Sequence, residues 1–351
     1  MLILLSSFLS LSIRSEDTIA AKAQRISHVQ ISHELKLSVY LPLSYGEHSS
    51  KTKSYPVLYI LDGERFFYNG VAYQSSLAHR AQIPEMIVVG VELPAKLRRT
   101  LFTSEKNSLS AQLQSKIIPF IDNKYRTSSQ RLIFGWEVAA TFVLESMANS
   151  PELFDAYFAI SPTQIGDNLH KRIQSGLKDI SASTKFAYVG ISRAEPWSIP
   201  ETNEINKAFN TDPQSRAKGF EWHYLVAEEG NHYSTSITLF FEGLQRFYRE
   251  FVPIRFYSIA EFEKFGGLNA VAKHYERRGQ RFLQPIDVHL DTIHYLLNQS
   301  VKEDSIDTFM EIVSTYPQFI RSYYTRDFWF ERYRGFLLKH QKQKLAIGLL
   351  D

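Results

Sequence analysis

Residues 131–140 read "RLIFGWEVAA", an apolar run that meets a glycine and then continues into a helical pattern. The run Leu132-Ile133-Phe134 is typical of a buried strand, and "VAATFVLESMANS" at 138–150 has the apolar spacing of a helix. A glycine between the two lets the backbone turn sharply and pass close to its neighbours. The stretch therefore predicts a strand that turns abruptly into a helix.

The same alternation of strand and helix covers residues 29 to about 250. Many of the β-rich runs are apolar throughout, as are strands buried on both faces of a parallel sheet. They lie at 35–43, 55–63, 86–93, 131–135, 156–162, 185–191 and 221–229. Helical patterns such as 108–125 and 234–251 lie between them, which predicts βαβ crossovers and a doubly wound, mostly parallel α/β sheet. The first two or three strands, close together in the chain, are expected to form an antiparallel edge.

After residues 251–256 the strand patterns stop, and residues 258–345 show helical patterns only. We therefore predict an α/β domain at 24–254 and a small all-α domain at 255–351. Helix pairs of this length are similar to degenerate tetratricopeptide units, which would make the domain TPR-like. A helical appendage packed on the sheet domain is the alternative.

Composition excludes several classes of site. A net charge of +3 is too small for a nucleic-acid-binding protein, which needs a concentrated basic face. The absence of cysteine excludes disulfides, thiolate nucleophiles and cysteine-ligated zinc. The 11 histidines lack the spacing of metal ligands, and there is no glycine-rich phosphate loop. We expect no metal and no cofactor.

The N-terminal segment "MLILLSSFLSLSI" is apolar but short for a membrane span. Ala21 and Ala23 fit a signal-peptidase site, so residues 1–23 are predicted to be a signal peptide of an exported, periplasmic protein. A buried N-terminal helix of a cytoplasmic protein is the alternative. No other segment is long and apolar enough to predict a membrane span.

The turn after 131–135 is where G-x-S-x-G would place a nucleophilic serine, but Glu137 occupies the serine position. A catalytic serine needs a base within hydrogen-bond reach, a carboxylate to orient that base, and two backbone N–H groups for the oxyanion. His232, in the polar turn after the last strand, is the candidate base. The backbone N–H groups of Glu64 and Val138 are the candidate oxyanion donors.

The acid is expected in the loop after strand 185–191. Glu195 is the first choice, and Glu201 and Glu204 are alternatives further along. A second motif, "GISRA" at 190–194, places Ser192 at the serine position of a G-x-S-x-small pattern. Pro196 follows closely and no helix begins directly after it, which disfavours Ser192 as the nucleophile.

Several segments between residues 26 and 250 resemble the esterase family of the α/β-hydrolase superfamily, especially siderophore esterases of the enterobactin and salmochelin type. They are "YPVLYILDGERFF", "IVVGVE", "SKIIPFIDNKYRTSSQRLIFG", "SPELFDAYFAISP" and "EEGNHYSTSITLFFEGLQRFY". The resemblance implies an α/β-hydrolase fold and assigns the catalytic histidine of the family to His232. Some members carry a helical, tetratricopeptide-like C-terminal extension, which residues 258–351 resemble.

The chain departs from the family at the nucleophile itself. Glu137 replaces the serine of G-x-S-x-G-G, and Ala139 and Ala140 replace the glycines that follow. A glutamate beside a histidine is expected to form an ion pair, here Glu137 with His232. We therefore expect ester hydrolysis to be lost or strongly reduced, and a small ester-like or hydrophobic molecule to be bound.

Two alternatives remain open. The protein could be an active carboxylic-ester hydrolase that uses Glu137 as nucleophile or base, or that uses Ser192. It could also be an interaction protein that binds a protein partner through its C-terminal helices, because a fold alone does not fix a function.

Overall fold

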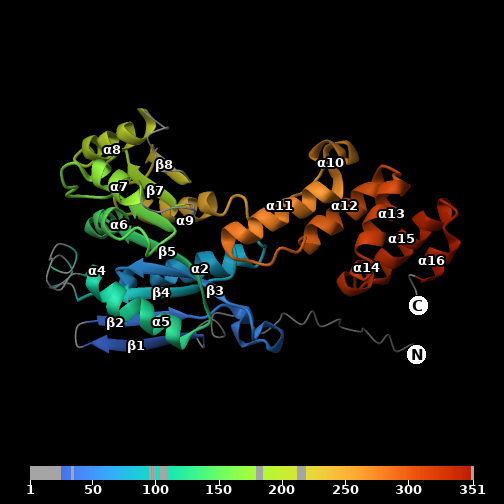
Figure 1. Cartoon of the computed structure of the whole chain (residues 1–351), viewed down its shortest axis with the longest axis horizontal. Helices are drawn as coiled ribbons and strands as arrows, with labels where there is room; N and C mark the ends of the chain where they lie inside the picture. The colour runs from blue at the N-terminus through green and yellow to red at the C-terminus, as the bar shows by residue number, and fades with distance from the viewer. Residues whose placement is uncertain are drawn as a thin grey trace, which may run out of the picture. The chain divides into compact units, whose positions relative to one another are not determined.

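The computed structural model describes residues 25–32, 35–94, 96, 98, 100, 102, 109–178, 185–211 and 219–348 (Figure 1). The chain divides into two compact units, the first ending at Arg249 and the second beginning at Glu250. The proposed signal peptide at 1–23 lies outside the described residues.

The described part of the first unit contains one eight-stranded sheet with the strand order β1-β2-β4-β3-β5-β6-β7-β8. Its strands are β1 (Ile26–Ser32), β2 (Leu35–Tyr40), β3 (Tyr55–Leu61), β4 (Ile87–Glu92), β5 (Thr127–Trp136), β6 (Ala156–Ile160), β7 (Lys185–Ser192) and β8 (Phe220–Ala227). Figure 1 shows β1 and β8 at opposite ends of the sheet. β1 and β2 pair antiparallel, and β2 pairs antiparallel with β4, whereas all other pairs are parallel. The predicted mostly parallel α/β sheet is confirmed.

Helices of the first unit connect these strands. They are α2 (Gly63–Ala78), α4 (Leu109–Gln112), the π-helical turn η4 (Leu113–Ile117), α5 (Ile118–Lys124), α6 (Val138–Asn149), α7 (Leu169–Lys178), α8 (Ile199–Thr211) and α9 (Thr235–Phe247), with short 3₁₀ turns η2 (Leu43–Gly46) and η3 (His48–Ser50).

The central strands place successive side chains on opposite faces of the sheet, and helices cover both faces. Ile133 belongs to the core cluster that includes apolar residues of α5, α6, α7 and α8. On the other face, Phe134 stacks on Phe240 of α9 with ring centroids 4.0 Å apart. This two-sided burial explains why the strands read as continuous apolar runs in the sequence.

The parallel strands end at one edge of the sheet, where their connecting turns gather. Gly63 follows β3, Glu137 follows β5, Glu195 follows β7 and His232 follows β8. In a sheet of this kind the carboxyl ends of the strands form the ligand-binding edge. Four distant parts of the sequence are thereby brought to one place.

The second unit is helical throughout its described part. Its helices are α10 (Ile259–Phe265), α11 (Gly267–Phe282), α12 (Leu290–Lys302), α13 (Ile306–Thr315), α14 (Phe319–Tyr323), α15 (Asp327–Lys339) and α16 (Gln343–Gly348). Buried side chains including Val271, Leu297, Phe309 and Tyr333 form its own core. Tyr324 adopts an extended backbone that separates α14 from α15.

Within the described ranges, no helix combines the length and the apolar character needed to cross a membrane.

We expect Gly135→Ala to lower the free energy of unfolding by about 1–3 kcal/mol, the usual cost of overpacking. A Cβ at residue 135 would lie 2.4 Å from the carbonyl oxygen of Ala139, so strand and helix would have to separate. Chemical denaturation measures the change. The matched control is Gly46→Ala, where a Cβ would meet nothing within 4 Å. Equal stability of the two variants would contradict the tight turn.

Candidate active site

The turn between β5 and α6 has a strained backbone. Glu137 adopts φ 61° and ψ −123° at the N-cap of α6, and its N–H donates to the carbonyl of Ile160 at 3.0 Å. A non-glycine residue in such a conformation costs on the order of 1–3 kcal/mol and persists only where its surroundings impose it. The sharp strand-to-helix turn expected from the sequence is therefore present, with Glu137 at its apex.

Arg98 holds the carboxylate of Glu137. Its Nη1 lies 3.2 Å from Glu137 Oε2, and its Nη2 also donates to the carbonyl of Trp136 at 3.3 Å. The same guanidinium binds Asp62 with two parallel hydrogen bonds, from Nε at 2.6 Å and from Nη2 at 2.8 Å. Arg98 thus connects the turn after β3 to the turn after β5.

The charges in this network support one another. Burial alone would lower the pKa of Arg98, but its hydrogen bonds to Asp62 and its proximity to Asp62 and Glu137 outweigh burial and raise that pKa. Asp62 is almost fully buried, so its carboxylate depends on this bidentate partner. Arg98 therefore stays charged and pairs with both carboxylates.

His232 is paired with Glu195. The imidazole Nδ1 lies 2.7 Å from Glu195 Oε2, and the Glu195 side chain is completely buried. A carboxylate on Nδ1 fixes the orientation of the ring and keeps the Nε2 lone pair available on its other side. This is the arrangement that an acid–histidine pair requires.

Two further groups orient the Glu195 carboxylate. Its Oε1 accepts hydrogen bonds from the Ser161 hydroxyl at 2.8 Å and from the Ser192 backbone N–H at 3.0 Å. The Ser192 hydroxyl is fully buried and donates to the carbonyl of Gly230 at 3.2 Å. Ser192 therefore contributes to the support of the acid, and its hydroxyl is turned toward the backbone. Sequence reasoning missed Ser161, although it is the next-to-last residue of the predicted strand 156–162 and lies at the same edge.

The two expected oxyanion donors lie at helix N-termini. Glu64 is the second residue of α2 and Val138 is the first residue of α6, where backbone N–H groups have no acceptor within the helix. Gly63 allows α2 to begin this close to the sheet, because a Cβ there would lie 2.6 Å from the carbonyl carbon of Gly90. Partial burial, as the largest cause, raises the pKa of the Glu64 side chain, whose Oε2 accepts from the N–H of Leu93.

Aromatic side chains surround the imidazole of His232. The Trp136 ring centroid lies 4.7 Å from it, and Trp136 Nε1 donates to the His232 carbonyl at 3.1 Å. Tyr233 and Trp197 lie at 5.2 and 6.2 Å and are 62% and 61% exposed. The Arg65 guanidinium lies over the Trp136 ring at 4.2 Å and near the Tyr233 ring at 5.6 Å. The edge therefore presents exposed aromatic rings with a cation beside them.

One expected contact differs from the structure. Glu137 was expected to pair with His232, but its ion pair within the described residues is with Arg98, and the carboxylate beside His232 is that of Glu195. The two residues are nonetheless neighbours through Trp136, which contacts the His232 ring. Of the other acid candidates, Glu201 and Glu204 are exposed on α8. Among the described residues, no cluster of acidic or histidine side chains could hold a metal ion.

Comparison with known proteins gives a consistent result. Residues 29–219, more than half of the chain, match the family described as "Putative esterase". Three solved structures share the fold at low sequence identity. They are an uncharacterised protein from Capnocytophaga ochracea (14% identity, 92% of this chain and 91% of that one, TM-score 0.65), an IroE-like serine hydrolase from Shewanella oneidensis (18%, 84% and 99%, 0.60) and the siderophore hydrolase EstA from Aspergillus nidulans (16%, 65% and 95%, 0.55).

We expect Glu195→Gln to move the proton of the neutral His232 ring from Nδ1 to Nε2. The glutamine oxygen can still accept from Ser161 and Ser192, but its NH₂ group then faces Nδ1, which must act as the acceptor. Ring ¹⁵N chemical shifts in mildly alkaline buffer report the tautomer. Glu228→Gln, which changes an exposed carboxylate paired with Arg193, is the matched control. An unchanged tautomer in Glu195→Gln would contradict the pairing.

Proposed function

We propose, from the premise that this chain belongs to the putative esterase family, that it binds a small ester-like or hydrophobic molecule at the His232 edge. In this proposal its ester-hydrolysing activity is lost or strongly reduced. The ligand lies where related enzymes hold an ester, and the remaining parts of the site bind it without forming an acyl-enzyme.

The observation that carries this proposal is the ion pair between Glu137 and Arg98 at the apex of the turn. A carboxylate held by a guanidinium is a weaker nucleophile than a free one, because attack would require it to give up a charge-assisted hydrogen bond. Acyl transfer through it would also form an anhydride. Loss of a triad serine leaves only the ~10³–10⁴-fold acceleration that binding and the oxyanion hole supply.

The surroundings of His232 support a ligand that has an aromatic ring and a negative charge. Exposed rings of Trp197 and Tyr233 offer stacking surfaces, and an aromatic ring pair contributes roughly 0.5–1.5 kcal/mol beyond area burial. Arg65 lies over the Trp136 ring and beside the Tyr233 ring, and its guanidinium can bind an anionic group. A benzoate-type acid has this combination.

Active carboxylic-ester hydrolysis is the second candidate, and the Glu195–His232 pair favours it. The pair could activate a nucleophile or a water molecule, because its geometry is that of a general base. Of the two nucleophiles considered, the Ser192 hydroxyl is buried and hydrogen-bonded to a backbone carbonyl, which leaves Glu137 as the stronger choice. In this case activity would depend on the Glu137 carboxylate.

We expect Glu137→Ser to raise kcat/KM for 4-nitrophenyl butyrate by at least about a hundredfold. The hydroxyl would stand at the apex of the turn near an oriented base, although the gain should stay below the ~10⁶-fold that a serine contributes in a complete triad. A fluorophosphonate probe should label only this variant. Adding His232→Ala to it should return the rate to that of the unmodified protein.

The variant Glu137→Gln separates the two candidates. It removes the charge with little change in shape, so a ligand-binding protein without turnover should behave as before in the ester assay. Measurable hydrolysis by the unmodified protein that Glu137→Gln abolishes would refute the proposed loss of activity and establish a working carboxylate.

We expect Arg65→Gln to weaken binding of 3,4-dihydroxybenzoate by about tenfold, the effect of losing one charge-assisted hydrogen bond. Tryptophan fluorescence measures the binding, because Trp136 and Trp197 lie beside His232. The neutral 3,4-dihydroxybenzamide should bind the variant and the unmodified protein equally. Arg80→Gln, at an exposed position just after α2, is the control. Equal losses for acid and amide would contradict the assignment of Arg65.

A further inference from the structure

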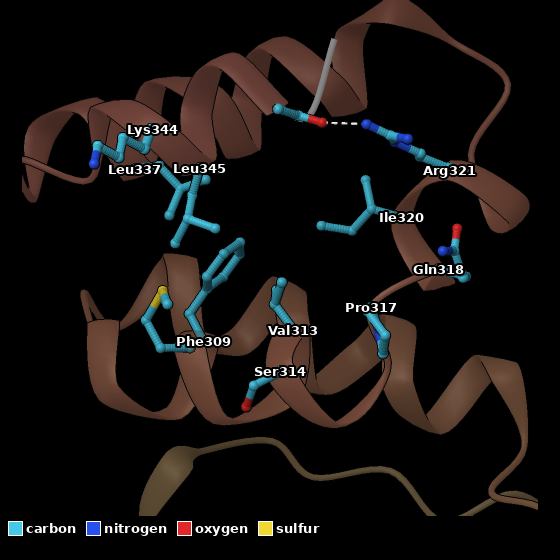
Figure 2. A pocket seen from close by; sticks show the side chains of 12 residues that line it. Phe309, Val313, Ser314, Pro317, Gln318, Ile320, Arg321, Leu337, Lys344 and Leu345 are labelled. Atoms are coloured by element: carbon cyan, nitrogen blue, oxygen red, sulfur yellow. Dashed lines mark hydrogen bonds between the residues drawn. The ribbon is translucent and has the colours of Figure 1, made fainter. Parts of the chain in front are cut away.

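The helical unit contains a cavity of its own, bordered by α13, α14, α15 and α16 (Figure 2). Its volume is about 360 Å³, toward the lower end of the roughly 300–1,000 Å³ that is usual for small-molecule sites. Most of its inner wall is apolar. The side chains that form this wall are Phe309, Met310, Val313, Ile320, Leu337 and Leu345.

Two apolar walls face each other across the cavity, and the space between them is open. Figure 2 shows Phe309 and Val313 rising from one helix toward Leu337 and Leu345, while Ile320 projects into the space between them. Phe309 and Leu337 are buried, but Leu345 is 41% exposed. An apolar side chain left open on a cavity of this size is stabilised when an apolar molecule covers it.

The charges at the rim have a single sign. Arg321 and Lys344 line the cavity, and none of the described lining residues is acidic. Arg321 donates one hydrogen bond to the carbonyl of Gly348, as Figure 2 shows, so one corner of its guanidinium is fixed in place. Neither cation forms an ion pair with a carboxylate in the described part of the chain. The rim therefore complements an anion.

We propose that this cavity binds a linear aliphatic carboxylate of medium chain length. The alkyl chain lies between the two apolar walls, where Met310 can adapt to its shape. The carboxylate binds Arg321, whose remaining N–H groups match the geometry of two carboxylate oxygens. Only one of the apolar wall residues, Phe309, is aromatic, so the cavity offers an aromatic ligand little stacking surface. An alkyl chain therefore fits it better than an aromatic ring.

This site is separate from the one at the sheet edge. All of its lining residues lie between 309 and 348, whereas the residues around His232 belong to the first unit. The proposal therefore stands or fails independently of whether Glu137 can take part in catalysis. It gives the helical unit a small-molecule ligand in place of a protein partner.

Isothermal titration of the full chain with decanoate and with 1-decanol tests the proposal. We expect one decanoate per chain and at least tenfold weaker binding of the alcohol, because the alcohol has the chain without the charge. Arg321→Gln should remove most of this difference, and Val313→Trp should fill the cavity and abolish binding of both. Arg334→Gln, which changes an arginine paired with Glu331 on α15, should leave the difference between acid and alcohol unchanged.

Because Arg321 also binds the backbone at Gly348, its variant could loosen α16. The comparison of acid and alcohol on the unmodified protein does not depend on that variant. A photoreactive decanoate analogue should label peptides within 309–348. Equal binding of acid and alcohol, labelling near His232, or concentration-dependent dimerisation that decanoate does not affect would each overturn the proposal.

Discussion

The backbone turn at Glu137 is the constraint on which the rest of the site depends. β5 and α6 approach so closely that residue 135 has no room for a Cβ, and residue 137 adopts a φ of 61° that a side chain rarely accepts. This conformation is costly in an ordinary loop. In a serine hydrolase it exposes the nucleophile. Here the turn carries the carboxylate of Glu137.

The proposed base and acid form a second hydrogen-bond network at the same edge of the sheet. His232 and Glu195 come from turns after β8 and β7, and Ser161 together with a backbone N–H holds the buried carboxylate in place. A buried polar group without a hydrogen-bond partner costs free energy, so hydrogen bonds to both oxygens of the buried carboxylate indicate an ordered site. Arg98 makes the difference. It binds Glu137 and Asp62 together, so the Glu137 carboxylate is paired with a guanidinium and the Glu195 carboxylate with the imidazole.

Much of this was predictable, because parallel strands bring their carboxyl ends to one edge. Each of Glu195 and His232 follows an apolar run, and that rule alone places them together. Ser161 could have been found by the same rule. Arg98 could not, since it lies between β4 and α4 in a segment without strand character, and its long side chain reaches three groups distant in sequence. The expected Glu137–His232 pair was wrong because sequence spacing does not show the direction in which a side chain leaves a strained turn.

The partner of Glu137 can be measured directly with two double-mutant cycles in chemical denaturation. One cycle combines Glu137→Gln with Arg98→Met, and the other combines Glu137→Gln with His232→Ala. The account predicts a coupling energy of about 1 kcal/mol or more between residues 137 and 98, and a value near zero between 137 and 232. Strong coupling to His232 with none to Arg98 would contradict it.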